Sequence, residues 1–280
     1  MTVMIAVDST SDIPQERARS LDITIIPLLV LFGDESYRDG IDLTTDEFYK
    51  KLTTSPVTPT TSAPSIGAFQ EAYEDMIRRG ATGILQLCLS AKLSATYSAA
   101  VQAAEMVSKE KNIPIEVVDS GQVSAAFGLP AQMLAKEAHD GASLEQLKAR
   151  AASILSRVYL YAALDTLEFL RRGGRISGTA AFAGSLLQVK PLLTVRDGEV
   201  VQLERIRTRG KAFERVGQLI AKLMPLEAMA IIGSDEDTRQ QLAAVVRPFW
   251  SGETNQGALG PVVGTHAGPG AGGIMGIIRE

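Results

Sequence analysis

Short apolar runs alternate with amphipathic segments through the first half of the chain. Residues 4–7, 83–89 and 115–118 are predicted strands, and residues 12–20, 94–109 and 129–139 are predicted helices. The longer apolar run at residues 23–32 is interpreted as one buried strand. Strands that alternate with helices favour βα units and a mostly parallel sheet. Ligands of such sheets bind at the carboxyl ends of the strands, where Asp8-Ser9-Thr10, residues 90–94 and Asp119-Ser120 are expected.

The second half of the chain has a different pattern, in which a hairpin stands among helices. Residues 191–195 and 200–203 are predicted strands joined by Asp197-Gly198, a pair typical of tight turns. Further strands are predicted at 158–164, 229–233, 262–263 and 274–278, and helices at 144–157, 166–172, 209–223 and 237–249. The predicted fold class is α/β, with an N-terminal mostly parallel βα sheet domain at residues 1–154 and a C-terminal α+β domain at residues 155–280.

Residues 53–65 consist almost entirely of Thr, Ser and Pro. Because proline removes a backbone donor and forces extended or turn conformations, no regular helix is expected there. Ser65 is a suitable N-cap for the amphipathic segment that follows as far as Arg79. Two interpretations stay open: a surface linker, or a loop that presents several hydroxyl groups to a ligand.

Few side chains in the sequence suit metal or thiol chemistry. The 280 residues include two histidines, His139 and His266, and one cysteine, Cys88. A structural zinc site needs four Cys or His ligands, so neither a metal site nor a cofactor is predicted. One cysteine cannot form an internal disulfide, which gives no sign of an oxidising compartment. The formal net charge of −4 argues against a general nucleic-acid binder.

The apolar runs give no signal for secretion or for spanning a membrane. Residues 1–5 lack the basic region and apolar stretch of a secretory signal. The run at residues 23–32 is about half of the roughly 20 residues that cross a bilayer. We therefore expect a soluble, cytoplasmic protein without an integral membrane segment.

Motifs for familiar cofactor and hydrolase sites are incomplete in this sequence. Residues 268–273 match G-x-G-x-x-G, but only seven residues follow, too few for the helix and acidic residue of a dinucleotide site. Neither a P-loop nor a G-x-S-x-G nucleophile elbow occurs. His139 is expected at a helix end, where it meets the last carbonyl groups. His266, at the end of a predicted strand among glycines, is the candidate site histidine.

Two basic clusters are concentrated in this acidic chain. They are Arg171-Arg172-Gly173-Gly174-Arg175 and Arg205-Ile206-Arg207-Thr208-Arg209. Guanidinium groups bind carboxylate or phosphate bidentately, although each cluster is also compatible with a solvated face. Hydroxyls, glycines, arginines and one histidine, without paired acids, favour an anion binder over a catalyst. A serine or threonine hydrolase with His266 as its base is the alternative, and it requires an orienting group as well.

Seven segments spread along the chain resemble those of the DegV family in the expected order. They are residues 7–12 (VDSTSD), 61–65 (TSAPS), 89–97 (LSAKLSATY), 170–176 (LRRGGRI), 184–191 (GSLLQVKP), 207–208 (RT) and 265–271 (THAGPGA). Each segment alone is weakly specific, whereas the set is highly specific. Ala91 and Ala95 stand where the family usually has serine and glycine, while Ser94 is retained.

The resemblance implies a two-domain α/β protein that buries one long-chain fatty acid in a tunnel between its domains. It further implies that the protein has no catalytic centre of its own and presents the carboxyl group to a separate ATP-dependent fatty acid kinase subunit, then carries the acyl phosphate. By analogy Thr61, Ser62 and Ser94 bind the head group, with His266 beside it. Arg175 and Arg207 face the kinase or the acyl phosphate. Transient contact with a membrane surface stays open.

Two rival functions belong to other classes. An acyl esterase or thioesterase would use a hydroxyl nucleophile together with His266, and turnover of a chromogenic acyl ester would reveal it. A DNA-binding regulator would need basic surface and a helix-turn-helix pattern. The net charge of −4 and the absence of that pattern argue against it.

Overall fold

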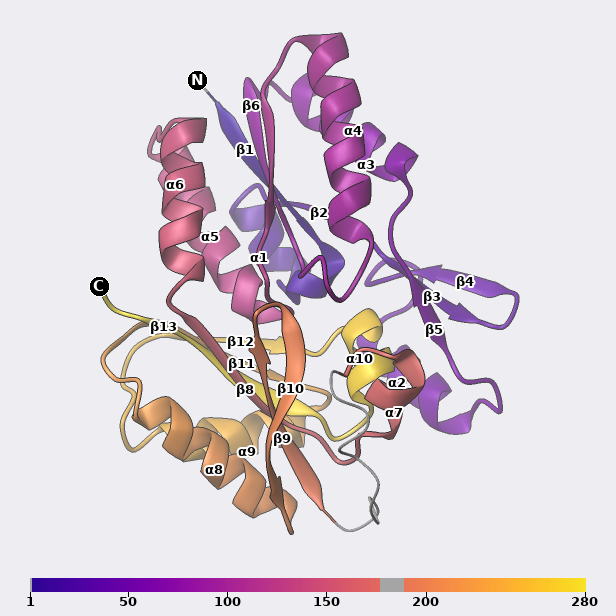
Figure 1. Cartoon of the computed structure of the whole chain (residues 1–280), viewed down its shortest axis with the longest axis vertical. Helices are drawn as coiled ribbons and strands as arrows, with labels where there is room; N and C mark the ends of the chain where they lie inside the picture. Colours follow the sequence, from indigo (N-terminus) through magenta and orange to yellow (C-terminus); the bar gives the residue numbers. More distant parts are fainter. Residues whose placement is uncertain (1, 177–188) are drawn as a thin grey trace.

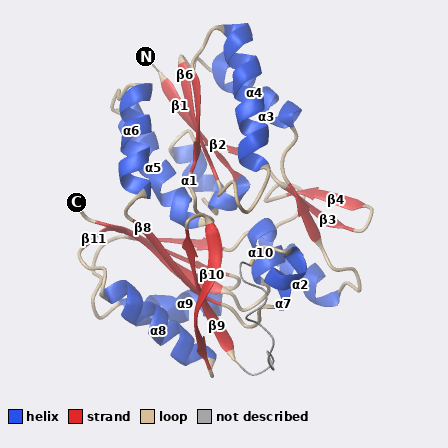
Figure 2. Cartoon of the chain, viewed as in Figure 1, coloured by secondary structure: helices blue, strands red, loops and turns tan. Residues whose placement is uncertain are grey.

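The computed structural model describes residues 2–176 and 189–280. Figures 1 and 2 show two large sheets with helices packed around them, and a smaller sheet beside them. This arrangement confirms the predicted α/β fold class. The residue limits predicted for the two domains, 1–154 and 155–280, stay a prediction. Residues 184–188 of the segment that resembles the DegV family lie outside the described residues.

The first sheet consists of parallel strands in the order β2-β1-β6-β7. Helices α3 and α4 cover one face, and α5 and α6 pack on the other. Ser65 caps α3 by accepting a hydrogen bond from the amide of Ala68, as the sequence predicts. The bounds are β1 Val3–Asp8, β2 Thr24–Ile26, β6 Gly83–Cys88, β7 Ile115–Asp119, α1 Gln15–Ser20, α3 Ile66–Arg78, α4 Thr96–Lys111, α5 Ala125–His139 and α6 Leu144–Leu155.

The second sheet is mixed and has the order β10-β9-β8-β13-β11-β12. Among the described strands of this sheet, β11 and β12 pair in parallel and the other neighbours are antiparallel. Asp197-Gly198 closes the β9–β10 hairpin, as predicted. The bounds are β8 Val158–Ala163, β9 Lys190–Arg196, β10 Glu199–Ile206, β11 Leu226–Gly233, β12 Thr254–Ala258, β13 Gly272–Ile278, with α7 Glu168–Gly173, α8 Arg209–Ala221 and α9 Glu236–Val246.

Helix α5 joins the two large sheets through one continuous core. Eleven of its 15 residues are buried, which means that it is covered on nearly all sides. It packs against β1 of the first sheet and against β8, β11 and β13 of the second. Helices α8 and α9 cover the opposite face of the second sheet with a separate cluster around Phe213. The inner face of the second sheet is thus the face available to a site between the sheets.

A small antiparallel sheet in the order β4-β3-β5 corrects the prediction for residues 23–32. The predicted single strand at 23–32 is two strands, because Pro27 separates β2 from β3 and the two join different sheets. Strand β4 lies within residues 33–40, where no strand was predicted, and the Thr-Ser-Pro segment at residues 53–65 contains β5. Helices α2 and α10 pack here around Phe48 and Val262. The bounds are β3 Leu29–Phe32, β4 Glu35–Arg38, β5 Thr60–Ser62, α2 Thr45–Thr54 and α10 Pro261–Ala267.

Two further predictions in the C-terminal region were wrong. The strand predicted at 262–263 is the start of α10, because Gly260 is its N-cap and Pro261 occupies the first helical position, for which proline is preorganised. His266 therefore lies in the last turn of a helix, and not at a strand end. Strand β12 was missed because Thr254–Ala258 has no apolar run; it is defined by its pairing with β11.

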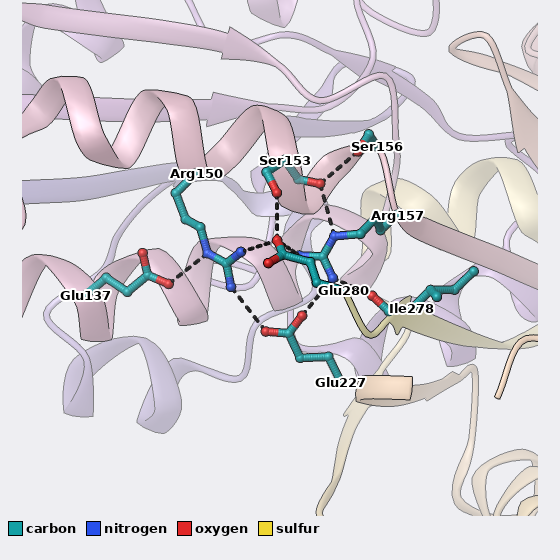
Figure 3. Close-up of polar contacts among 8 residues, drawn as sticks. All are labelled: Glu137, Arg150, Ser153, Ser156, Arg157, Glu227, Ile278 and Glu280. Carbon is teal, nitrogen blue, oxygen red and sulfur yellow. Dashed lines mark hydrogen bonds and ion pairs between the residues drawn. The ribbon is translucent and has the colours of Figure 1, made fainter. Parts of the chain in front are cut away.

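Ion pairs tie the two large sheets together near the junction of α6 and β8 (Figure 3). Arg150 of α6 binds Glu137 of α5 at 3.1 Å and Glu227 of β11 at 3.1 Å. Arg157 binds the same Glu227 at 2.8 Å. Both arginines also bind the C-terminal residue Glu280, at 2.8 and 3.1 Å respectively. One network thus links α5 and α6 to the second sheet.

Candidate functional site

A cavity of about 360 Å³ lies where the two large sheets, the small sheet and α10 meet. Its volume is in the range of pockets that hold small organic ligands. Most of its lining is aliphatic and comes from residues far apart in the sequence, among them Leu28, Leu89, Leu93, Leu160, Leu193 and Met275. The cavity therefore suits a ligand that is mainly apolar.

Five of the six sequence-predicted site residues line this one cavity. They are Thr61 and Ser62 of β5, Ser94 in the turn after β6, Arg175 after α7, and His266 of α10. The sixth, Arg207, is exposed between β10 and α8 and is not among the lining residues. The structure thus brings the predicted head-group residues together and leaves Arg207 apart from them.

His266 and Thr61 form a direct polar contact at the cavity wall. Thr61 Oγ1 lies 2.9 Å from His266 Nε2. Burial, reinforced by the nearby Arg175 guanidinium, lowers the pKa of His266 to about 4. The imidazole is therefore neutral near pH 7. Its Nδ1 is buried and has no hydrogen-bond partner among the described residues.

Gly173 allows the backbone after α7 to approach His266. A Cβ atom at this position would lie 2.2 Å from His266 Nδ1, so no larger residue fits. The next residue, Gly174, has a φ of 67° and ends α7, and the Arg175 amide donates back to the Leu170 carbonyl oxygen at 3.2 Å. This helix ending directs the chain so that Arg175 reaches the cavity, as the two glycines of the sequence motif suggest.

The Arg175 guanidinium remains exposed while it contacts the loop after β6. Its Nε donates to the Leu93 carbonyl oxygen at 3.3 Å, and another of its nitrogens donates to the Gly173 carbonyl oxygen. In the same loop, the Ser94 hydroxyl lies 2.8 Å from the Thr96 hydroxyl. A positive charge and hydroxyl groups therefore share one end of a mainly aliphatic cavity.

Three buried aspartates behind this end were not recognised as site residues from the sequence. Burial raises the pKa of Asp8 to about 6, of Asp39 to about 7 and of Asp12 to about 8. Asp12 accepts a hydrogen bond from the Gly260 amide at 2.9 Å, and Asp39 accepts one from the Val262 amide, so both hold the start of α10. Asp8 accepts from the Leu89 amide at 2.7 Å and fixes the end of β6.

Two of these aspartates, Asp8 and Asp12, stand in the polar segment at the end of the first strand. Asp8 and Asp12 belong to the segment that resembles the DegV family, but only tertiary structure shows that they hold α10 and the loop after β6. They are positioning residues, because they act on His266 and Ser94 through the backbone segments that carry these side chains.

The site lacks two features that other chemistries require. Among residues 2–176 and 189–280, no group of three or more His, Cys, Asp or Glu side chains is arranged to hold a metal ion. The Thr61–His266 pair resembles a nucleophile with its base, but within the described part of the chain no carboxylate binds His266 Nδ1 to orient the ring. In that same part, no helix has the length and apolarity needed to cross a membrane.

The fold and the site together define a class of protein: an α/β protein with a mainly aliphatic cavity that has charged and hydroxyl side chains at one end. The family model described as "Uncharacterised protein, DegV family" matches residues 2–279. The chain belongs to the DegV family. A DegV domain-containing protein from Halalkalibacterium halodurans is 33% identical over 290 residues, which cover 99% of each chain.

Solved structures of similar proteins have the same fold. DegV from Bacillus subtilis, described as a fatty acid binding protein, superimposes with a TM-score of 0.87 at 33% identity and covers 100% of both chains. A stearic acid-binding protein from Eubacterium ventriosum has a TM-score of 0.89 at 26% identity, and the match covers 99% of this chain and 98% of that one. Both of these proteins are described as binding fatty acids.

Proposed function

We propose that this protein binds one long-chain fatty acid in the cavity between its sheets. The main support for this proposal is that Thr61, Ser94, Arg175 and His266 lie together at one end of a mainly aliphatic cavity. Each methylene group that leaves water gains about 0.8 kcal/mol, so an acyl chain supplies ample affinity. Burying a carboxylate without donors is costly, which explains why the polar end is needed. The fatty-acid-binding relatives support the same ligand class.

Within this proposal, Thr61, Ser62 and Ser94 donate hydrogen bonds to the carboxylate. In the tautomer with its proton on Nε2, the neutral His266 donates to Thr61 Oγ1, which leaves the Thr61 proton free for the carboxylate. Its Nε2 is already within 2.9 Å of Thr61, while its Nδ1 has no partner among the described residues. Arg175 adds a positive charge at the same end. The carboxyl group thus lies at the polar end and the acyl chain extends along the aliphatic wall.

The proposal extends to a partner that performs the chemistry. We infer that the protein has no catalytic centre and presents the carboxyl group to an ATP-dependent fatty acid kinase subunit. The exposed Arg175 and Arg207 are suited to contact that subunit or the acyl phosphate, since guanidinium groups favour phosphate. These roles, and a cytoplasmic location, stay predictions.

The first test is the identity of any lipid that copurifies with the protein. Protein purified from a bacterial host is extracted, and the extract is analysed by mass spectrometry. The proposal predicts about one long-chain fatty acid per chain. Absence of such a lipid, together with no binding when fatty acid is added, would refute the proposal.

Two sets of variants separate the head-group site from the partner contact. Thr61→Ala and Ser94→Ala are expected to weaken fatty acid binding by roughly tenfold each while the fold is kept, because each removes one hydrogen bond to a charged group. Thr60→Ala is the matched control, since Thr60 is exposed on the same strand and does not line the cavity. Unchanged affinity in both site variants would remove the proposed head-group site.

Arg207→Ala is expected to keep lipid binding but to lose kinase-dependent phosphorylation of the bound acid. Arg175→Ala is expected to lose phosphorylation and also to weaken lipid binding, because Arg175 lines the polar end of the cavity. Arg247→Ala, an exposed arginine after α9, serves as the control. Normal turnover of both variants with a cognate kinase would refute the partner role. Hydrolysis of a chromogenic acyl ester that His266→Ala abolishes would instead support the esterase, which the Thr61–His266 contact favours.

A further inference from the structure

The strands of the second sheet give the cavity a direction. Strand β8 leads through Leu164 to α7, and α10 leads through Ala271 into β13. Because α7 and α10 pack together next to Arg175 and His266, the polar end of the cavity lies at this end of the two strands. Because neighbouring side chains on one face of a strand are two residues apart, the cavity wall continues along β8 to Leu160 and along β13 to Met275. Four residues of strand span about 13 Å. Leu160 and Met275 are thus the lining residues farthest from the polar end on these two strands.

Small residues form the middle of this wall. Ala162 of β8 faces Gly273 of β13, and Leu193 and Ile232 are their partners on the outer strands. A Cβ atom at Gly273 would lie 2.9 Å from Ala162 Cβ, which shows how closely the two backbones approach. The side chains of this row are therefore small in its centre and large at both sides. Together with the neighbouring rows they form a trough that runs along the strands.

Bulky residues close the trough at its far end. The next row pairs Leu160 with Met275, and the row after it pairs Val158 with Ile277. Val158 and Ile277 are buried in the core between the sheets and do not line the cavity. Leu160 and Met275 are themselves 7% and 3% exposed, so they stand between the cavity and solid core.

The other hydroxyl side chains that line the cavity, Thr10, Ser124 and Thr194, have their protons engaged in hydrogen bonds to the protein. Thr10 donates to Asp8 and Ser124 donates to Asp12. Thr194 donates to the Leu160 carbonyl oxygen at 2.7 Å. These hydroxyls offer no donor to a ligand, so the tail region discriminates between ligands by volume.

We propose that Leu160 and Met275 determine the longest acyl chain that this protein accepts, with Ala162 and Gly273 forming the passage that leads to them. This inference rests on the proposed function. The ligand class is a straight-chain fatty acid whose methyl end contacts the Leu160–Met275 row. Removal of the Met275 side chain extends the trough toward Val158 and Ile277, and a larger side chain at position 162 blocks it.

The test compares the lengths of chain that variants bind. Delipidated wild type, Met275→Ala, Ala162→Leu and Met229→Ala are each incubated with an equimolar series of saturated fatty acids from lauric to arachidic acid. Bound lipid is measured by mass spectrometry. Met229 is the matched control because it is a fully buried methionine on the opposite face of the same sheet.

Met275→Ala is expected to shift the bound distribution to longer chains, since each further methylene that the enlarged trough buries improves affinity about fourfold. Ala162→Leu is expected to lose the longest chains and keep the shorter ones, and Met229→Ala to bind as wild type does. If Met275→Ala does not fold, the loss or retention of the longest chains in Ala162→Leu tests the proposal by itself. Loaded variants with the wild-type distribution would overturn this inference only, whereas a wild type without bound fatty acid would overturn the proposed function with it.

Discussion

At the scale of single residues, the surroundings of His266 explain how a carboxylate can be held without a formal charge on the imidazole. Burial and the neighbouring Arg175 keep the ring neutral, and Thr61 contacts one of its nitrogens. The three buried aspartates lie on the other side of α10 and the loop after β6, where they fix backbone amides. Arg175 thus supplies the positive charge at the site, and the aspartates fix the backbone segments that carry the site residues.

Binding of a fatty acid is expected to raise the pKa of His266 from about 4. The bound carboxylate favours the protonated ring, because an opposite charge within a few ångströms stabilises it. NMR titration of the ring protons measures this directly, since the chain has only one other histidine, His139. His139→Gln assigns the signals. An unchanged His266 titration in fully loaded protein would argue against a carboxylate beside the ring.

The free energy of unfolding is expected to fall as the pH rises from 6.5 to about 8. The folded pKa values of Asp12 and Asp39, about 8 and about 7, lie above the usual 3.8, so the folded state holds more protons than the unfolded chain in this window. His266 acts in the opposite sense only below its usual pKa of 6.5. Chemical denaturation at several pH values measures how steeply the free energy of unfolding falls with pH, and Asp12→Asn should make this fall less steep. A flat or rising profile in wild type would contradict these pKa shifts.

At the scale of the elements, the sequence predicts those strands and helices whose pattern is local. β1, β6, β7 and the β9–β10 hairpin follow from apolar runs and one turn motif. Two differences between the predicted and the observed elements depend on tertiary structure. Strand β12 has polar residues and forms by pairing with β11. The apolar run at residues 23–32 is divided at Pro27 into β2 and β3, which belong to different sheets. The third difference, a helix in place of the strand predicted at 262–263, has a local cause. Gly260 and Pro261 start α10 and outweigh the β-propensity of Val262 and Val263.

Gly128→Ala is expected to destabilise the fold by about 1–3 kcal/mol through overpacking. The added Cβ would lie 2.3 Å from the Ser11 carbonyl oxygen, where α5 meets the turn after β1. Thermal and chemical denaturation measure the loss. Gly210→Ala in α8 is the control, since its added Cβ would meet no atom within 4 Å beyond its own stretch of helix, and alanine favours a helix by about 0.5–1 kcal/mol. Equal stability of the two variants would contradict this close packing.

At the scale of the whole molecule, the site is made by segments that are distant in the sequence. Thr61 and His266 are 205 positions apart and meet only because the small sheet and α10 pack together. The resemblance to a known family nominated residues that line the cavity, although composition and periodicity do not show that they meet. Neither the family resemblance nor the sequence pattern indicated that Leu160 and Met275 lie at the far end of the cavity, because their position depends on the register of β8 and β13.

Arg157→Ala is expected to lower stability by about 1–3 kcal/mol, because Glu227 would lose a partner in a partly buried setting. The network that joins α5 and α6 to the second sheet would be interrupted (Figure 3). Arg78→Ala breaks only an exposed pair with Asp75 and should cost about 0.5 kcal/mol or less. Urea denaturation of both variants measures the difference. Similar losses would show that the network does not link the sheets energetically.

The most direct test of the central claim is a calorimetric titration of the delipidated protein with palmitic acid and, separately, with palmityl alcohol. The two ligands have the same chain length and differ in the head group. One palmitic acid is expected to bind per chain, and the alcohol is expected to bind at least about tenfold more weakly because it cannot form the charge-assisted hydrogen bonds. Equal affinity for both ligands, or no binding of palmitic acid, would contradict it.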